Sequence, residues 1–376
     1  MLNKFSVSNF KGFKDTITFD LTAKDYEFNP NIIKNGVVNK AIIYGKNGVG
    51  KSNLGKAIFD IIYHLTDNKK LDNNLPETYF NLESKQKVAS FKYTFKFDND
   101  IVQYEYQRKA LGVLLNETLY FNDEKIIDVN YYRYQDKYIN YQYINASFNA
   151  NIDLNGLSLI KYIYRNTDLS KLDLLSKMMN YVNNMLWFRS LSDGNSFAGF
   201  SNIQGAFLAD CLAQYNAVQE FQKFLETYDL HYHLRLKETN GVNTLMTQFT
   251  NEEGKTEEVP FEAVASTGTK AIYLFFVWKK LAFEQKVSLV FIDEFDAFLH
   301  YEAAESLVSG LNKLGGFQTI LTSHNTYLMN NKITRPDSCY IITDNRIKAL
   351  TDCTDKEIRE AHNLEKMYRN GAFVNE

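Results

Sequence analysis

The sequence predicts an α/β fold with an antiparallel β-subdomain and an inserted helical lobe. Two short apolar runs, 41–44 and 289–292, have the composition of buried parallel strands, and each leads into small or acidic residues. Apolar and polar residues alternate from about 91 to 121, which predicts antiparallel strands, and apolar residues at helical spacing extend from about 156 to 230. We therefore expect the first half of the core, with the β-subdomain, over 1–150. A mainly helical lobe is expected over 151–235, and the second half of the core over 236–376.

The residues after the first apolar run match a phosphate-binding loop, in which a glycine and four further residues precede Gly-Lys-Ser. Glycines let the backbone wrap around an anion, and the amphipathic helix expected next presents its positive end to the same phosphates. Lys51 is then expected to reach the β- and γ-phosphates of ATP, and Ser52 to ligate Mg²⁺. A chance glycine-rich turn is the alternative, but a strand and a helix flank the loop in the required order. The residues expected to bind ATP here are Gly45, Asn47, Gly48, Val49, Gly50, Lys51, Ser52 and Asn53.

Composition excludes several classes of protein. The net charge of −3 and the pI of about 6.1 do not support binding to nucleic acid, although a local basic patch is compatible with them. The three cysteines (211, 339 and 353) show no metal-ligand spacing, which favours a reducing compartment. The N-terminus has no signal-peptide core, and no apolar run approaches the ~18 residues of a membrane span. We expect a cytoplasmic protein that does not bind membranes.

The first segment is predicted to form strands around 5–7 and 17–21, joined by a turn over 9–14, that flank the nucleotide site. The helical lobe shows no heptad pattern that persists over several turns, so a long coiled-coil arm is not expected. Because the lobe interrupts the core, its position alone suggests that it recognises a partner. His231 and His233 share one face of a likely strand, and core or surface positions are favoured over a metal site.

Tyrosines are dense between 131 and 143. Such a run could stack on nucleobases or on a partner, but alternating aromatics in a half-buried sheet produce the same pattern, and we favour the sheet. The tyrosines are Tyr131, Tyr132, Tyr134, Tyr138, Tyr141 and Tyr143.

The second apolar run ends in Asp293 and Glu294. In an open α/β sheet, ligands bind at the carboxyl ends of the strands, so these acids are expected beside the phosphate loop. Asp293 is expected to hold Mg²⁺, and Glu294 to polarise the attacking water.

Three further elements carry a resemblance to a known family. The segment 266–270, Ser-Thr-Gly-Thr-Lys, resembles the signature of ATP-binding-cassette (ABC) ATPases, in the variant of SMC-related and RecF-like proteins. Asp296 resembles the D-loop aspartate of that superfamily and His324 its switch histidine, and all elements occur in the expected order. The chain looks similar to stand-alone bacterial ATPases of antiphage defence, including relatives of the overcoming-lysogenisation-defect, Septu and PARIS ATPases.

This resemblance implies an ABC-type P-loop ATPase core that uses ATP and Mg²⁺. It also implies a head-to-tail dimer, or a higher oligomer, in which Ser266, Thr267, Gly268 and Asp296 face the ATP of the partner, and in which His324 helps Glu294 to place water. Taken singly, these residues could instead be a helix cap, a surface acid and a loop histidine. The signature departs from the transporter sequence Ser-Gly-Gly-Gln, and no Q-loop glutamine can be placed, Gln86 being only a candidate.

Three functions are compatible with this ATPase. The resemblance favours the sensor or regulatory ATPase of an antiphage defence system, which controls a separate effector or toxin protein through ATP-dependent dimerisation. The first alternative is a RecF- or SMC-like ATPase that acts on DNA in repair. The second alternative is an assembly scaffold that binds ATP and turns it over slowly.

Overall fold

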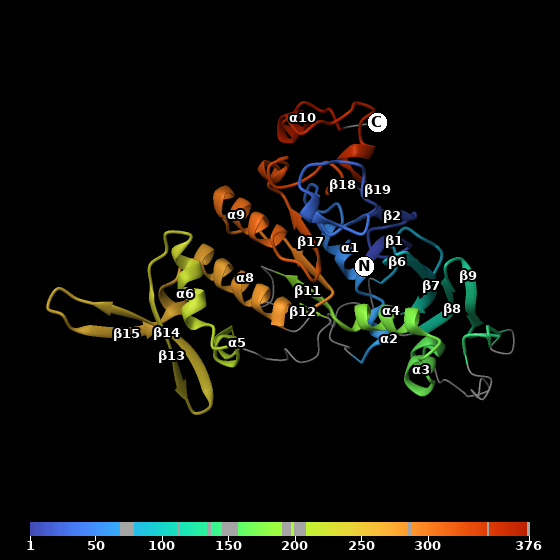
Figure 1. Ribbon diagram of the computed structural model, residues 1–376, viewed down its shortest axis with the longest axis horizontal. Helices are drawn as coiled ribbons and strands as arrows, with labels where there is room; N and C mark the ends of the chain where they lie inside the picture. Colours follow the sequence, from blue (N-terminus) through green and yellow to red (C-terminus); the bar gives the residue numbers. More distant parts are fainter. Residues whose placement is uncertain are drawn as a thin grey trace.

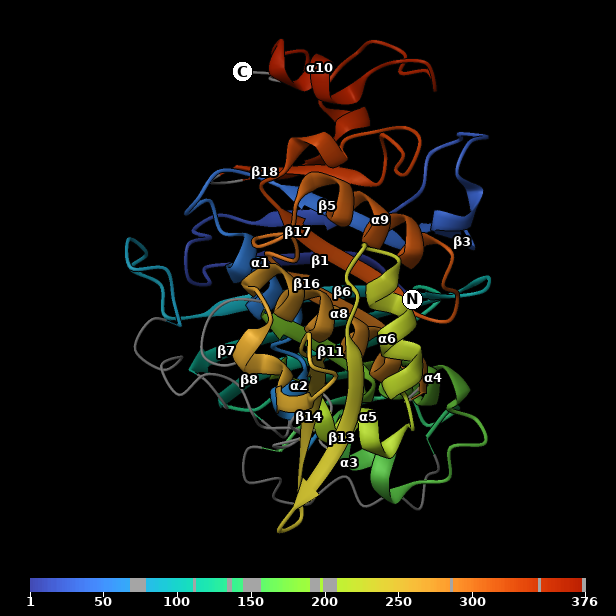
Figure 2. The ribbon, with the colours of Figure 1, turned by 90° about the vertical axis from the view of Figure 1, so that its left-hand side faces the viewer.

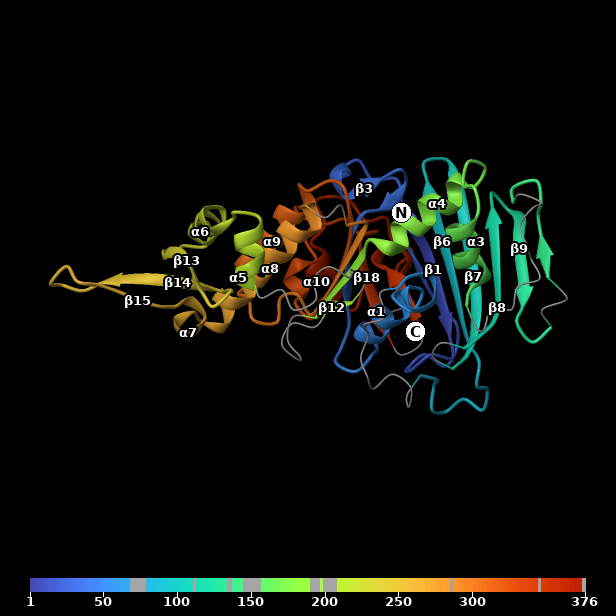
Figure 3. The same cartoon turned by 90° about the horizontal axis from the view of Figure 1, so that it is seen from below.

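The molecule contains two seven-stranded sheets beside each other and a smaller three-stranded sheet that projects from one end (Figure 1). Seen from below, the three sheets follow one another along the long axis, with the mixed core sheet in the middle (Figure 3). This arrangement confirms the predicted α/β class with antiparallel sheets. The computed structural model describes residues 1–67, 79–110, 113–133, 137–144, 157–189, 197–198, 208–284, 287–343 and 346–373.

The core sheet has the order β12-β11-β16-β17-β5-β18-β19. Its five inner strands are parallel, and only β12 and β19 at its edges run antiparallel to their neighbours. The two predicted apolar runs lie in β5 and β16, which are buried along their whole length. Parallel strands end at a common edge, so the residues that follow them meet there. The strands are β5 (Lys40–Tyr44), β11 (Met185–Arg189), β12 (Phe197–Ala198), β16 (Leu289–Asp293), β17 (Gln318–Ser323), β18 (Cys339–Thr343) and β19 (Arg346–Ala349).

The region 151–235, predicted as an inserted and mainly helical lobe, contains helices and also a strand of the core sheet. Helices do form there, but β11 lies between them and pairs in parallel with β16 inside the core sheet. Its sequence is a short apolar run after a helix, and periodicity cannot distinguish such a run from a helix that continues. The parts of the lobe at 151–156, 190–196 and 199–207 lie outside the described residues. The helices are α3 (Leu159–Asn166), α4 (Asp173–Asn183), α5 (Leu208–Gln214) and α6 (Val218–Glu226).

The second large sheet is antiparallel and has the order β10-β9-β8-β7-β6-β1-β2. Alternation along β6 buries Phe91, Tyr93 and Phe95 against the helices, whereas Lys92 is exposed. The predicted meander is therefore confirmed. The strands are β1 (Leu2–Ser8), β2 (Ile17–Asp20), β6 (Ala89–Phe97), β7 (Asp100–Ala110), β8 (Val113–Phe121), β9 (Glu124–Asn130) and β10 (Tyr138–Ile139).

The tyrosines between 131 and 143 lie in two different environments, some packed against the sheet and others exposed. Tyr131 donates a hydrogen bond to the buried Glu117, and Tyr143 packs against Phe121, as the interpretation as sheet residues requires. Three others, Tyr132, Tyr138 and Tyr141, are exposed, and Tyr134 lies outside the described residues.

The projecting sheet has the order β13-β14-β15, and Figure 2 looks along the direction in which it projects, with α6 beside β13 and α8 behind. Helix α8 connects this sheet to the core. Its Tyr273 stacks on Phe221 of α6, the helix that packs on β13, and its Trp278 stacks on Phe188 of the core strand β11. His231 and His233, at the start of this sheet, are exposed. Among the described helices none is both long and apolar enough to cross a bilayer. The elements are β13 (His233–Thr239), β14 (Val242–Thr250), β15 (Thr256–Pro260), α7 (Phe261–Val264), α8 (Thr267–Glu284), α9 (Tyr301–Asn312) and α10 (Leu364–Arg369), with β3 (Ile33–Lys34) and β4 (Val37–Val38) as a separate small ribbon.

The helix after the phosphate loop lies between the two large sheets as α1 (Lys51–Ile58) and the short α2 (Ile62–Leu65). Between them, the buried Asp60 carboxylate accepts hydrogen bonds from Tyr79 (2.9 Å) and Tyr106 (2.8 Å) and lies 3.1 Å from Nε of the fully buried Arg108. Burial raises the pKa of Asp60, and the Arg108 charge opposes that rise. The phosphate-loop helix is thereby tied to β7.

The same buried network continues to α3. Tyr104 bonds to the ring of His64 (2.7 Å) and donates to the buried Glu117 carboxylate of β8 (2.9 Å). Glu117 in turn accepts the backbone N–H groups of Leu159 (2.6 Å) and Ile160 (3.2 Å) at the start of α3. These N–H groups have no partner within their own helix, so a buried carboxylate satisfies them.

Removal of Asp60 should be strongly destabilising. The variant Asp60→Ala leaves the Arg108 guanidinium buried without its counter-ion, and we expect a loss of about 3–5 kcal/mol in the free energy of unfolding. Urea denaturation measures this loss. The control Glu105→Ala breaks the exposed pair with Lys92 on the outer face of the same strands and should cost at most about 1 kcal/mol. Equal effects of the two substitutions would contradict the structural role of the network.

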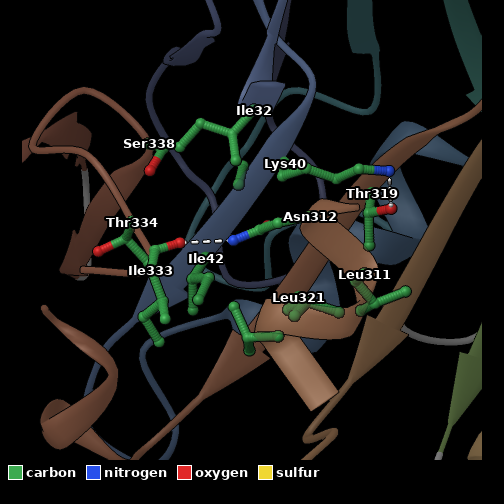
Figure 4. Close-up of a pocket in the computed structure, with 12 residues that line it drawn as sticks. Ile32, Lys40, Ile42, Leu311, Asn312, Thr319, Leu321, Ile333, Thr334 and Ser338 are labelled. Atoms are coloured by element: carbon green, nitrogen blue, oxygen red, sulfur yellow. Dashed lines mark hydrogen bonds between the residues drawn. The ribbon is translucent and has the colours of Figure 1, made fainter. Parts of the chain in front are cut away.

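Lys40 is buried at the amino end of β5, where its side chain contacts a carbonyl, a hydroxyl and an aromatic ring (Figure 4). Its Nζ donates to the carbonyl of Phe317 (2.9 Å) and to the Thr319 hydroxyl (3.1 Å), and it lies 4.3 Å from the centre of the Phe317 ring. Burial lowers the pKa of Lys40 to about 7. In the unfolded chain the same amine has a pKa of about 10.4.

This difference predicts a pH-dependent stability. Between pH 7 and 10 the unfolded chain binds a proton that the folded Lys40 does not, so the stability due to this residue rises with pH, by about 1.4 kcal/mol per unit. Below pH 7 both states are protonated and the penalty for the buried charge is constant. The variant Lys40→Met should lose this part of the slope, which urea unfolding at pH 7, 8 and 9 would measure. An unchanged slope would show that Lys40 is charged in the folded protein across this range.

Candidate functional site

The phosphate loop connects β5 to α1 and needs glycine for two physical reasons. Gly48 and Gly50 have φ angles of 82° and 104°, which side chains with a Cβ rarely adopt. A Cβ at Gly50 would also lie 2.8 Å from the Phe13 ring, and one at Gly45 would lie 2.8 Å from Ile342 of β18. The loop is therefore held between β18 and the turn after β1, which places the predicted N-terminal turn beside the nucleotide site.

Lys51, the first residue of α1, lies inside this loop. Its Nζ donates hydrogen bonds to the carbonyl oxygens of Gly45 (2.9 Å) and Lys46 (3.0 Å). Burial lowers the pKa of Lys51, and the negative charges of Glu294, then Asp293 and Asp296, oppose this effect. The loop cation is thus close to the predicted acids.

The acids reach this place through the register of the core sheet. Strand β17 lies between β5 and β16, with Ser323 opposite Tyr44 and Leu321 opposite Ile292. Asp293 is buried, and Glu294 follows with its side chain 41% exposed and a left-handed φ of 52°. A non-glycine residue in this conformation is strained, and such residues concentrate at functional sites.

His324 completes the group of side chains at this edge. Its Nδ1 lies 3.4 Å from Lys51 Nζ, and its Nε2 lies 4.0 Å from Glu294 Oε1. One histidine ring therefore stands between the loop cation and the carboxylate predicted to activate water. Sequence positions 51, 294 and 324 meet within one site.

Asp296 does not fit the alternative of a surface acid. It accepts a hydrogen bond from the Ser323 hydroxyl at 2.6 Å. Burial raises the pKa of Asp296, and the bond from Ser323 opposes this rise. Asp296 is therefore fixed to the end of β17, next to His324.

The signature segment caps α8. The Ser266 hydroxyl accepts a hydrogen bond from the backbone N–H of Thr269 (3.1 Å) and bonds to the Thr269 hydroxyl (2.8 Å), so both bonds lie within the first turn of α8. Ser266 and Thr267 are exposed. A Cβ at Gly268 would lie 3.1 Å from the carbonyl of Phe298, which places this turn against the loop that contains Asp296.

Two residues that sequence reasoning missed lie in this site. Thr322 and Ser323, the last residues of β17, bond to Asp293, Glu294 and Asp296. Their signal was a pair of hydroxyl side chains directly after Ile320 and Leu321 and immediately before His324. Gln86, the Q-loop candidate, is exposed in a loop, and its backbone carbonyl accepts a hydrogen bond from the Asn9 side-chain amide (2.7 Å).

The residues present fit ATP as a substrate and Mg²⁺ as its metal. The glycine backbone at 45–50 forms a cradle that Cβ atoms would obstruct, and an eight-residue helix begins directly behind it. Ser52 and Asp293 offer the hydroxyl and carboxylate oxygens that Mg²⁺ prefers. Asn53, in the first turn of α1, lies beside Gly12 of the N-terminal turn, where a Cβ would approach its amide to 3.2 Å.

Comparison with solved structures finds SMC heads. The SMC head domain from Thermotoga maritima is 14% identical, with 93% of this chain and 98% of that chain covered and a TM-score of 0.44. An SMC head bound to the C-terminal winged-helix domain of ScpA is 16% identical, with 92% and 96% covered and a TM-score of 0.46. An SMC head from Pyrococcus furiosus, bound to the C-terminal domain of ScpA, is 12% identical, with 92% and 95% covered and a TM-score of 0.43.

Comparison with curated proteins gives no match. A family model matches residues 40–330, a range that begins with β5 and includes the phosphate loop, Asp293, Glu294 and His324. The family is described as "AAA domain, putative AbiEii toxin, Type IV TA system". Since the match spans well over half of the chain, this protein belongs to the AAA domain family of that description.

Proposed function

We propose that the protein hydrolyses ATP to ADP and phosphate in sites that two copies of the chain share. The observation that carries the proposal is the convergence of Lys51, Glu294 and His324: the His324 ring lies 3.4 Å from Lys51 Nζ and 4.0 Å from Glu294 Oε1. The loop N–H groups and the start of α1 would cradle the phosphates. Mg²⁺, held by Ser52 and Asp293, would supply charge neutralisation at the phosphate oxygens.

Lys51 has a defined part in binding. Its ammonium group bonds to two loop carbonyls, and it would exchange them for phosphate oxygens when ATP binds. Glu294 would accept the proton of the attacking water, because it is the carboxylate that is partly exposed beside the loop, whereas Asp293 is buried. His324 would hold the water or the γ-phosphate from the other side.

The proposal assigns the signature segment to the partner copy. Helix α8 is 18 residues long, and its exposed amino end, at Ser266 and Thr267, carries the positive end of a helix dipole. In a head-to-tail pair this end would face the γ-phosphate bound by the other subunit. ATP would then hold the two copies together, and its hydrolysis would release them.

We further propose that the ATPase is a cytoplasmic sensor or regulator in an antiphage defence system. The family description, which mentions a putative toxin and a toxin–antitoxin system, supports a role next to a toxic effector. The net charge of −3 makes DNA a less suitable partner. The effector would be a separate protein, and affinity purification from infected and uninfected cells would test this role. Tight DNA binding at physiological salt, without a bound protein, would instead favour the repair function.

The first test is the substitution Glu294→Gln, which keeps the shape and removes the base. We expect turnover to fall about 100-fold or more, and we expect the variant to remain dimeric in Mg·ATP, because the bridging γ-phosphate is not lost. Light scattering with and without Mg·ATP, beside a phosphate-release assay, measures both effects. Bound ATP on a protein that stays monomeric would contradict the shared site.

The second test asks whether Ser266 acts on the partner's ATP. The variants Lys51→Met and Ser266→Arg should each be inactive alone. Mixed in equal amounts, they should recover about a quarter of wild-type turnover, because half of the dimers are mixed and each has one intact site. Two copies of the same inactive variant provide the control. No recovery, with mixed dimers present, would place Ser266 outside the partner's site.

A further inference from the structure

Strand β17 ends in two adjacent hydroxyl side chains that bond to different catalytic segments. The Thr322 hydroxyl donates to Asp293 Oδ1 at 2.7 Å and accepts the backbone N–H of Glu294 at 2.7 Å. The Ser323 hydroxyl donates to Asp296 Oδ2 at 2.6 Å and accepts the backbone N–H of Asn325 at 2.8 Å. Both residues are completely buried, at 0% exposure, so water does not replace these bonds.

Thr322 holds the carboxylates at the end of β16. Regular pairing of β16 with β17 stops at Ile292 and Leu321, and the chain turns at Glu294 into its left-handed conformation. In that conformation the Glu294 N–H bonds to the Thr322 side chain, where a regular strand would bond to a neighbouring backbone. The same hydroxyl uses its single proton on Asp293. One oxygen therefore orients both the proposed metal ligand and the residue that carries the proposed base.

Ser323 bonds to the segments on either side of His324, the proposed switch residue. Its bond to Asp296 fixes the loop that follows Glu294, and its bond to Asn325 fixes the backbone that follows His324. His324 is thus held between two restrained neighbours at the distances from Lys51 and Glu294 given above. Loss of this bond would free the loop that also packs on Gly268 of the signature turn.

We propose that Thr322 and Ser323 are positioning residues, which set the geometry of Glu294 and His324 for hydrolysis without touching the substrate. This proposal rests on the proposed ATPase function. Because misplacement of a catalytic group by about 1 Å can cost about 100-fold in rate, the hydroxyls should affect kcat much more than nucleotide affinity. Because Thr322 also bonds to Asp293, loss of its hydroxyl should raise the Mg²⁺ concentration that nucleotide binding needs.

The test compares Thr322→Val, which has the same shape without the hydroxyl, with Thr322→Ser, which keeps the hydroxyl. We expect kcat to fall about 10- to 100-fold for Thr322→Val and to recover for Thr322→Ser. The affinity for a non-hydrolysable ATP analogue should change less than about threefold, and more Mg²⁺ should be needed for half-maximal analogue binding. The matched control is Thr319→Val, which removes a buried hydroxyl from the opposite end of the same strand, where it bonds to Lys40.

The outcomes separate this proposal from the one it rests on. A wild-type protein that shows no turnover of Mg·ATP would overturn the ATPase function itself. Wild-type turnover in Thr322→Val, or an equal loss in Thr319→Val, would overturn the positioning role while the ATPase function stands. If Thr322→Val does not fold, Ser323→Ala provides the second variant: a loss of kcat with intact analogue binding supports the role, and unchanged kcat overturns it.

Discussion

The site depends on the register of β5, β17 and β16 in the core sheet. These strands come from residues 40–44, 318–323 and 289–293, and their parallel pairing brings three distant chain segments to one edge. A shift by one residue would turn every side chain of a strand to the opposite face. The pairing of the backbones therefore sets the distances from His324 to Lys51 and Glu294.

Charge balance at this edge follows from the same pairing. Lys51 is buried in the loop close to Asp293, Glu294 and Asp296, and their negative charges counteract the unfavourable effect of burial on its ammonium group. The proposed ATP would add negative charge to the same place, which the proposed Mg²⁺ and the positive end of α1 would balance. The exposed start of α8 offers a further positive helix end, which in the proposed dimer would face the ATP of the second copy.

The second sheet is coupled to the nucleotide site through buried polar groups. Asp60, at the end of the phosphate-loop helix, contacts Arg108, and Glu117 continues the network to the start of α3. Buried ionic groups of this kind tolerate few rearrangements, because a separated partner would remain desolvated and unpaired. A movement of α1 is thus opposed by the antiparallel sheet, which makes that sheet part of the nucleotide-binding unit.

The sequence by itself determined the phosphate loop, the two acids after an apolar strand and the alternating meander, since each is a local pattern with a local physical cause. Glycine geometry, strand burial and period-two alternation all operate within a few residues. Only the tertiary structure decided that 185–189 is a strand of the core, that Thr322 and Ser323 bond to the segment that follows β16, and that Asp60, Arg108 and Glu117 share one buried network. These features depend on which distant segments become neighbours in space. The local sequence of a short apolar run, a hydroxyl or a charged residue does not reveal which distant segment it will contact.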